Sequence, residues 1–350
     1  MFALILEQTA HLCYTCEKDF RRKGAAQMNI AEIAKLAGVS SAAVSRYFNH
    51  GYISEEKKAA IQKVVEETGY RPSVQAQTLR TKKTRMIGVV VPKIASTSIG
   101  RVVEGILSVV EKRSYQMLLA VTQNDPKKEL EYLDVLDEKQ VDGVILVGTV
   151  LTAEHKRMLK DLPVPAVVVG QQLSGRCCVY HDDYQATYAM TCHVLEKGRK
   201  RLGYIGAIMQ DKAVGAERYR GFAEAVRGAG LEALAENHVT AAFTLASGYE
   251  KMEELSARCG PLDAVICATD TMAAGAIQYL REQGIKVPEQ VLVTGQGDSE
   301  MAKMTAPPFP TVHYAYEKSG VLAAQMLMEA LDKKDVELTE VKLGYRLVEG

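Results

Sequence analysis

The sequence predicts a small all-α head followed by an α/β body that contains two doubly wound parallel sheets. Three observations lead to this prediction. Apolar residues recur at helical spacing in the first part of the chain, up to about residue 72. From Met86 onward, short β-branched runs alternate with amphipathic helical segments, which is typical of parallel sheets. At 350 residues, the chain is also too long for one compact domain.

Residues 30–49 follow a helix-turn-helix pattern. The first apolar face ends at Gly38, which supplies the backbone freedom that a tight turn between helices requires. Ser40 is placed to cap a second helix, expected from about Ser41 to Phe48. In such a unit the second helix enters the DNA major groove, and its exposed N-terminal half meets base edges. The sequence therefore predicts that the head binds DNA.

A third helix completes the predicted head, residues 28–72. Ser54 is its expected cap, and Gly69 ends it. Its apolar face is formed by Ala60, Ile61, Val64 and Val65. Residues 73–85 are expected to be a linker that forms a hinge helix only on DNA or a partner chain, because it is short and polar.

The charge of the chain is unevenly distributed. Residues 28–85 hold ten Lys or Arg against five Asp or Glu, a net charge of +5, although the whole chain is neutral. A basic end on an acidic body fits DNA contact confined to that end. There is no apolar run of 18 residues and no signal-peptide pattern, and the seven cysteines are scattered. These features favour a cytoplasmic protein without membrane contact.

Residues 1–27 are interpreted as an upstream extension outside the native protein. Met28 lies two residues before the first expected helix, where a start is expected. The segment Lys23-Gly24-Ala25 can be encoded by a sequence that contains a ribosome-binding site at a suitable distance. The true start is therefore predicted at Met28.

The body, residues 86–350, is predicted from its alternating pattern. The expected strands are Ile87–Val91, Met117–Val121, Gly143–Val147, Ala166–Val169, Leu202–Ile205, Ala264–Cys267 and Val291–Thr294. The expected helices between them include Val102–Arg113, Lys127–Glu138, Tyr184–Glu196, Arg218–Gly228 and Thr271–Gln283. More than 260 residues of this pattern are better accommodated by two sheets than by one.

Several segments resemble the lac repressor/galactose repressor family. The resemblance rests on residues 30–49, Thr68-Gly-Tyr-Arg-Pro72, Val179-Tyr-His-Asp-Asp-Tyr184, Arg218-Tyr-Arg-Gly-Phe222 and Ala268-Thr-Asp-Thr-Met272. Asn49-x-Gly-Tyr, Leu79-Arg-Thr-Lys-Lys-Thr84, Val91-Pro-Lys93 and Gly297-Asp-Ser299 are most similar to sucrose operon repressors of Gram-positive bacteria. The resemblance implies a periplasmic-binding-protein-like body of two lobes with a sugar in the cleft. It also implies a homodimer, with a tetramer as the alternative, on palindromic operator DNA. The lack of an obvious leucine-heptad tail favours the dimer.

The resemblance also implies DNA-contacting residues. In the second helix, these are Ser41, Ala42, Ala43 and Arg46, with Asn49, Ala76 and Leu79 further along the chain. Arg46 is suited to a bidentate contact with guanine, and a phosphate contact is its alternative. Leu79 resembles the leucine that opens a central base step from the minor groove, and packing against the body is its alternative.

Most candidate ligand-binding residues lie in loops after expected strands, where doubly wound sheets bind ligands. The candidates are Gln171, Arg218, Thr269, Asp270, Gln296, Asp298 and Tyr314. Tyr314 is expected on a return crossover, where its ring suits the apolar face of a sugar, and a position in the core is its alternative. Arg218 matches an arginine that binds effector in the family, and a structural ion pair is its alternative. Asp270 is suited either to sugar hydroxyls or to capping the next helix. Gly297 stands where many relatives have a ligand-binding Asp, so Gln296 or Asp298 is expected to take over that contact.

One further motif, His181-Asp182-Asp183, invites a catalytic or metal reading. We instead expect Asp183 to cap the helix that begins at Tyr184. No zinc spacing, phosphate-binding glycine loop or nucleophile elbow is present, so no metal, cofactor or catalytic residue is expected.

The predicted function is that of a transcriptional repressor for a sugar operon, released from DNA by sucrose, fructose or a phosphate of either. One alternative is a regulator of the same family that a purine or a phosphoprotein partner activates as corepressor. A transport-type sugar-binding protein is another alternative, but the basic head argues against it because such a protein does not bind DNA. A glycosidase needs paired carboxylates at a fixed separation, which the sequence does not define.

Overall fold

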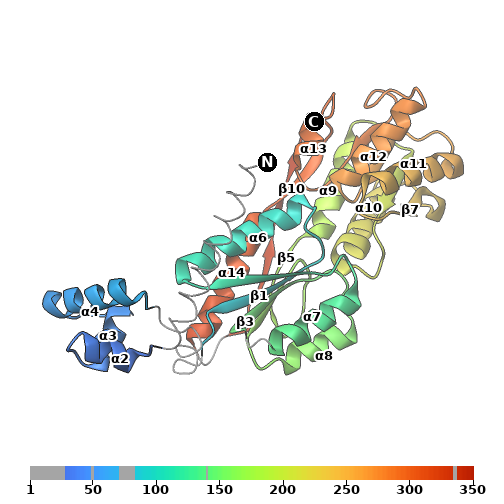
Figure 1. Ribbon diagram of the computed structural model, residues 1–350. Coiled ribbons are helices and arrows are strands. Elements are labelled where there is room, and N and C mark those ends of the chain that lie inside the picture. Colours follow the sequence, from blue (N-terminus) through green and yellow to red (C-terminus); the bar gives the residue numbers. More distant parts are fainter. Residues whose placement is uncertain (1–27, 49–50, 71–82, 139–140, 334–336) are drawn as a thin grey trace, which may run out of the picture. The chain divides into compact units, whose positions relative to one another are not determined.

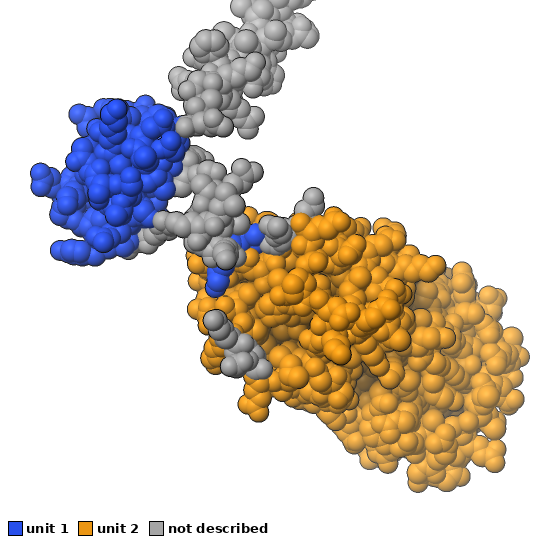
Figure 2. Space-filling view, turned by 90° about the horizontal axis from the view of Figure 1, so that it is seen from below, with its two compact units in different colours: residues 1–84 blue, residues 85–350 orange. Residues whose placement is uncertain are grey.

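The computed structural model describes residues 28–48, 51–70, 83–138, 141–333 and 337–350. The chain divides into two compact units, residues 1–84 and 85–350, which Figure 2 colours separately. We call the helical part of the first unit the head and the second unit the body. The predictions made for residues 1–27, and for the hinge helix over residues 71–82, lie outside the described residues. None of the described helices is both long and apolar enough to cross a lipid bilayer.

The described residues of the head form three helices, as predicted. They are α2 (Ile30–Leu36), α3 (Ser41–Phe48) and α4 (Glu55–Thr68). The turn between α2 and α3 contains Gly38, whose φ is +64°, a conformation that glycine adopts without strain. The backbone N–H of Ala43 donates to Ser40 Oγ at 3.2 Å, which confirms the expected cap of α3.

The cap predicted for α4 is wrong in one respect. Ser54 does occupy the N-cap position with an extended backbone, but its side chain makes no capping hydrogen bond. The backbone carbonyl of Ser54 accepts from the N–H of Lys58 instead. Glu55 and Glu56 lie in the first turn, where their negative carboxylates interact favourably with the positive end of the helix dipole.

The body contains two parallel sheets, each in its own lobe (Figure 1). In the first lobe six strands are arranged in the order β11-β5-β4-β3-β1-β2. Their bounds are β1 (Met86–Val91), β2 (Gln116–Val121), β3 (Gly143–Val147), β4 (Ala166–Val169), β5 (Cys177–His181) and β11 (Glu340–Leu343). The first four confirm predicted strands to within a residue, whereas β5 and β11 were not predicted.

Helices cover both faces of this first sheet. One face packs on α6 (Thr97–Val110) and α14 (Tyr316–Asp332), and the other on α7 (Pro126–Glu138) and α8 (Ala153–Asp161), as Figure 1 shows. Strand β1 illustrates why: Val89 belongs to the first of these cores and Val90 to the second, because successive side chains alternate between faces. A short helix, η1 (Glu111–Arg113), extends α6.

The second lobe is built on four parallel strands in the order β7-β6-β8-β9. Their bounds are β6 (Leu202–Gly206), β7 (His238–Thr240), β8 (Ala264–Cys267) and β9 (Leu292–Thr294). The helices of this lobe are α9 (Asp183–Glu196), the π-helical η2 (Lys212–Glu217), α10 (Arg218–Gly228), η3 (Ala235–Asn237), α11 (Leu245–Cys259), α12 (Asp270–Glu282) and α13 (Glu300–Met304). One apolar core joins the sheet to its helices.

The chain passes between the lobes three times. The crossings lie between β5 and α9, between β10 (Thr311–Tyr314) and α14, and between β11 and β12 (Tyr345–Val348). Strands β10 and β12 pair antiparallel, with Tyr314 opposite Tyr345. Each lobe is therefore assembled from separate stretches of sequence, and the space between the lobes is bordered by the crossings.

Candidate functional site

A cavity of about 390 Å³ lies between the two lobes of the body. Its wall is formed by segments that follow the carboxyl ends of strands in both sheets. In the first lobe these segments follow β1, β2, β3 and β4, and in the second lobe they follow β6, β7, β8 and β9. Parallel α/β sheets bind ligands at this edge, because helix N-termini and loop side chains converge there. The volume suits a small organic ligand.

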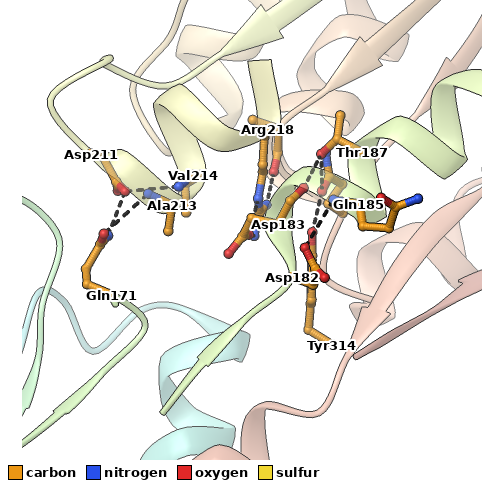
Figure 3. A network of polar contacts seen from close by, with 12 residues as sticks. Gln171, Asp182, Asp183, Gln185, Thr187, Asp211, Ala213, Val214, Arg218 and Tyr314 are labelled. Carbon is orange, nitrogen blue, oxygen red and sulfur yellow. Dashed lines mark hydrogen bonds and ion pairs between the residues drawn. The ribbon is translucent and has the colours of Figure 1, made fainter. Parts of the chain in front are cut away.

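A buried ion pair forms one part of the wall. The Nε of Arg218, at the start of α10, donates to Asp183 Oδ1 at 2.7 Å (Figure 3). The two side chains are 4% and 6% exposed. Arg218 also donates to the carbonyl of Ala268, and its guanidinium lies 4.8 Å from the ring centroid of Tyr314. The guanidinium is thus held from three sides by Asp183, Ala268 and Tyr314.

A second polar contact joins the lobes across the cavity. Gln171 follows β4 in the first lobe, and its Nε2 donates to Asp211 Oδ1 at 2.8 Å in the second lobe (Figure 3). The N–H of Ala213 donates back to Gln171 Oε1 at 3.3 Å, and the N–H of Val214 donates to Asp211 Oδ1 at 3.0 Å. Burial raises the pKa of Asp211 to about 6.

Gln296 is oriented by two hydroxyls. Its Oε1 accepts from Tyr314 at 2.7 Å and from Thr187 at 3.2 Å. Its Nε2 is buried without a hydrogen-bond partner in the described part of the chain, as is His181 Nε2. Both residues line the cavity. Buried polar atoms normally have partners, so these two are available to a ligand or to water.

The start of α12 forms another part of the wall. Thr269 is the N-cap residue, and its hydroxyl accepts from the N–H of Met272. Asp270 does not cap this helix; its carboxylate accepts from the N–H of Ser299 at 2.8 Å and from the hydroxyl of Thr311. Burial raises the pKa of Asp270. Asp270 therefore fixes the segment after β9 and presents a carboxylate at the cavity.

Five of the seven candidate ligand-binding residues line the cavity: Gln171, Arg218, Thr269, Asp270 and Gln296. The other two do not belong to its wall. Asp298 forms ion pairs with His313 at 2.8 Å and with Lys303 at 3.4 Å. Tyr314 is buried beneath Arg218 and supports Gln296. The position next to Gly297 that faces the cavity is thus Gln296 rather than Asp298.

The sequence analysis missed other residues of the wall. Asp211 and Phe243 follow β6 and β7 in the second lobe, and their position after a strand was the available signal. The expectation that Asp183 caps α9 is wrong: Asp182 is the N-cap, and its side chain accepts from the N–H of Gln185. Asp183 is therefore available to pair with Arg218.

Two more contacts join the lobes beside the cavity. Lys93 Nζ, after β1, donates to the carbonyl of Phe243 at 3.1 Å and lies 5.1 Å from the centroid of its ring. Burial lowers the pKa of Lys93. Arg101 of α6 donates to the carbonyls of Gly297 at 3.3 Å and Asp298 at 3.0 Å.

In the head, helix α3 has the exposed N-terminal half expected of a helix that reads DNA. Ser41, Ala42 and Arg46 are exposed. Ala43, in contrast, is buried in the core of the head, so its methyl group is not presented at the surface and we no longer assign it to DNA contact. Asn49, Ala76 and Leu79 lie outside the described residues.

The described residues contain no group of three or more His, Cys, Asp or Glu placed to hold a metal ion. The wall offers hydrogen-bonding groups and the aromatic side chains of Phe243 and Tyr316, an arrangement suited to reversible binding. A helix-turn-helix head and a two-lobed body with a cavity between its lobes together define a class: DNA-binding transcription regulators with an effector domain.

Comparison with known proteins gives the family. Residues 29–73 match the family model of bacterial regulatory proteins of the lacI family, and residues 191–350 match that of the periplasmic binding protein-like domain. A sucrose operon repressor from Staphylococcus xylosus is 30% identical over 88% of this chain and 95% of its own length. The chain belongs to the lacI family of transcription regulators.

Two further likenesses bear on the ligand. A transcriptional repressor named PurR, from Mannheimia succiniciproducens, is 29% identical over 91% of this chain and 96% of its own length. The structure of a transcriptional regulator, CelR, in complex with cellobiose is 28% identical, with a TM-score of 0.71 over 92% of this chain and 98% of that one. A relative named as a sucrose operon repressor, one named PurR and one seen in complex with cellobiose are thus about equally similar to this chain.

Proposed function

We propose that this protein is a repressor of a sugar-utilisation operon, and that a sugar in the cavity of the body releases it from operator DNA. Sucrose or a component of it is the proposed effector. The protein acts as a homodimer whose two heads contact the half-sites of a palindromic operator. Residues 28–72 form the DNA-binding domain, residues 73–85 the hinge, and residues 86–350 the sensor.

The observation that carries the proposal is the set of unpaired polar atoms in the cavity wall. His181 Nε2 and Gln296 Nε2 are buried, and each lacks a partner among the described residues. A ligand with several hydroxyl groups supplies both donors and acceptors to such atoms, which removes the cost of leaving them unsatisfied. The likeness to a sucrose operon repressor and to a cellobiose-bound regulator supports the same chemistry.

For the DNA half, the proposal assigns Ser41, Ala42 and Arg46 of α3 to the major groove. Arg46 reads guanine through two parallel hydrogen bonds. The resemblance adds Asn49, Ala76 and the minor-groove wedge Leu79.

Signal transfer depends on contacts between the lobes. Gln171–Asp211 and Lys93–Phe243 both join the lobes at the cavity wall, so a bound sugar changes the groups that hold the lobes together. The sugar shifts the balance between DNA-bound and released states only by its difference in affinity for the two.

A second candidate function has the opposite sign. The likeness to a purine-named repressor supports a corepressor that strengthens DNA binding. A phosphoprotein corepressor is a further form of this alternative. Each predicts tighter operator binding when its ligand is added.

The test is a titration of the protein on labelled DNA from its own promoter, followed by fluorescence anisotropy at fixed salt concentration. Sucrose, fructose, their phosphates and hypoxanthine are added in turn. Release by a sugar supports the proposal. Tighter binding with hypoxanthine supports the corepressor function instead, and no response to any sugar contradicts the proposed effector. The salt concentration is held constant because phosphate contacts make DNA affinity strongly salt-dependent.

A variant locates the response in the cavity. Ser299→Ala removes one hydroxyl of the cavity wall, so we expect the sugar concentration needed for release to rise by about fivefold to tenfold, which corresponds to one lost hydrogen bond to the sugar. Ser256→Ala, on α11 of the same lobe and away from the cavity wall, is the matched control. An equal response of the two variants would place the effector elsewhere.

A further inference from the structure

The cavity wall contains charged groups of both signs, and their present partners decide which of them a ligand can contact. Among the described residues, the wall contains two basic side chains, Lys93 and Arg218, and three carboxylates, Asp183, Asp211 and Asp270. Whether the cavity accepts an anion depends on whether either basic group can leave its present partners.

Arg218 lines the cavity but is already paired within the protein. It pairs with Asp183 at 2.7 Å, donates to the Ala268 carbonyl, and lies over the ring of Tyr314. An anionic ligand that recruited Arg218 would leave Asp183 buried without its counter-charge, which is strongly unfavourable.

Lys93 is also engaged. Its Nζ donates to the carbonyl of Phe243 at 3.1 Å and lies over the Phe243 ring. Burial also lowers the pKa of Lys93, because it disfavours the charged ammonium. The first residues of α6 also reach the wall, but a helix N-terminus offers only roughly half a positive charge.

The carboxylates of Asp211 and Asp270 are held by uncharged hydrogen-bond donors. Asp211 is 3% exposed, and its Oδ1 accepts from Gln171 and from a backbone N–H, both of them uncharged donors. Asp270 is likewise held by an N–H and a hydroxyl. Both have raised pKa values because burial disfavours their charge, and a second anion nearby would oppose them further.

The groups that remain for a ligand are neutral. Gln296 Nε2 and Ser299 Oγ carry no charge, and burial lowers the pKa of His181, which keeps its imidazole neutral at pH 7. We propose that the cavity selects an electrically neutral, hydroxyl-rich ligand and excludes its phosphorylated form, with Asp211 as the residue that determines this exclusion. This inference rests on the proposed function, since it names the chemical class of the sugar.

The direct test measures ligand binding to the full-length protein by isothermal titration calorimetry. The probes are sucrose, fructose, cellobiose, sucrose 6-phosphate, fructose 6-phosphate and hypoxanthine. We expect a neutral sugar to bind at least about a hundredfold more tightly than its phosphate, because like charges placed together in a buried site are costly. Tighter binding of a phosphate than of its parent sugar would overturn the inference but leave a sugar-responsive repressor intact.

The other outcomes are also decisive. Binding of hypoxanthine alone would contradict the proposed sugar function and the hydroxyl-rich class of the inference, because hypoxanthine is neutral but carries no sugar hydroxyls. Binding of none of the probes would contradict both, since the assignment of the cavity to this ligand class would then fail.

A variant tests the role of Asp211 itself. Asp211→Asn removes the charge and keeps an oxygen that accepts from the N–H of Val214, so the local turn is retained. We expect the affinity for fructose 6-phosphate, relative to fructose, to rise about tenfold. Asp161→Asn, an exposed carboxylate at the end of α8, is the control and is expected to leave the ratio unchanged. If this affinity ratio is unchanged in Asp211→Asn, Asp211 does not determine the exclusion of the phosphate. If the ratio is also unchanged in Asp270→Asn, the whole inference is overturned.

Discussion

The head and the body differ in what they bury. The core of the head consists of apolar side chains, among them Ile33, Val44, Ile61 and Val64. The described side chains that are both polar and buried all belong to the body, including Asp183, Asp211, Arg218, Asp270 and Gln296. The head thus keeps its recognition groups on the surface, whereas the body keeps its recognition groups inside.

This difference reflects what each unit binds. DNA is larger than the head, so an exposed helix on a small apolar core is sufficient to reach it. A small molecule must be enclosed to be recognised, and enclosing it requires buried polar groups that partner one another when the ligand is absent. Variants of the two units should therefore fail in different ways.

The largest effect is expected from Arg218→Ala in the body. It leaves the Asp183 carboxylate buried without its partner, so the free energy of unfolding of the body should fall by about 3–5 kcal/mol. Urea denaturation followed by circular dichroism measures the change. Arg220→Ala is the control on the same helix, because its ion pairs with Glu217 and Glu224 are half exposed and worth less than about 1 kcal/mol. Similar losses in the two variants would remove the distinction between the interior and the surface of the body.

The next effect is expected from Ile61→Ala in the head. Ile61 is completely buried, so its truncation should cost about 2–4 kcal/mol, a large share of the stability of so small a domain. Operator binding should be lost, while ligand binding by the body is retained. Gln62→Ala, which removes an exposed hydrogen bond to Glu66, is the matched control. Loss of ligand binding together with DNA binding would show that the two units do not fold independently.

A third prediction concerns pH and Asp211. Its pKa in the folded protein is about 6, above its ordinary value of 3.8, so the folded state binds this proton more tightly than the unfolded state. The resulting stabilisation is fully present below pH 3.8 and is lost as the pH rises through about 6. As the pH rises from 5 to 7.5, the free energy of unfolding of the wild type should therefore fall by roughly 1–2 kcal/mol more than that of Asp211→Asn.

The control for this pH dependence is Asp263→Asn. Hydrogen bonds from Arg201 lower the pKa of Asp263 to about 2, so its stabilisation is present above pH 3.8 and is lost only as the pH falls through about 2. Its replacement should change stability without changing the slope between pH 5 and pH 7.5. Parallel stability profiles for the wild type and Asp211→Asn would contradict the assignment of this titration.

The smallest effect is expected from Asn29→Ala at the start of the head. The Asn29 side chain accepts from the N–H groups of Ala31 and Glu32, and the Glu32 carboxylate accepts from the N–H of Asn29. Loss of this cap should cost about 1 kcal/mol, measured as faster hydrogen exchange in α2. Glu32→Gln preserves the reciprocal hydrogen bond and should behave nearly as the wild type. Equal exchange in both variants would show that the cap contributes nothing.

The same contrast explains what the sequence could predict. The head was predicted nearly to the residue because its signals are local: Gly38 and Gly69 mark a turn and a helix end, and each has a positive φ. In the body, seven strands were found, but β5, β7, β10, β11 and β12 were missed. Of these, β11 pairs at the edge of the first sheet with a strand far away in sequence, and β10 and β12 pair with each other rather than within a large sheet. A short strand is defined by its partner, which no local pattern reveals.

The cavity was predictable only in part for a related reason. Gln171, Asp270 and Gln296 were found because they follow strands, a position that a sequence displays. The pairs Arg218–Asp183 and Gln171–Asp211 join residues 35 and 40 positions apart, and nothing near either residue indicates its partner. The alternatives considered for Arg218, a ligand contact or an ion pair, are not exclusive, since it lines the cavity while paired to Asp183.

The three crossings between the lobes have a consequence for how the protein is made. The first lobe needs α14 and β11, which a ribosome synthesises last, whereas β1 to β5 are complete by residue 181. At about 5–20 residues per second, the remaining stretch takes roughly 10–30 seconds to translate. The head is complete from residue 70 onward and can fold throughout that interval. We therefore expect each nascent chain to pass through a period in which it can recognise DNA but cannot yet sense a ligand.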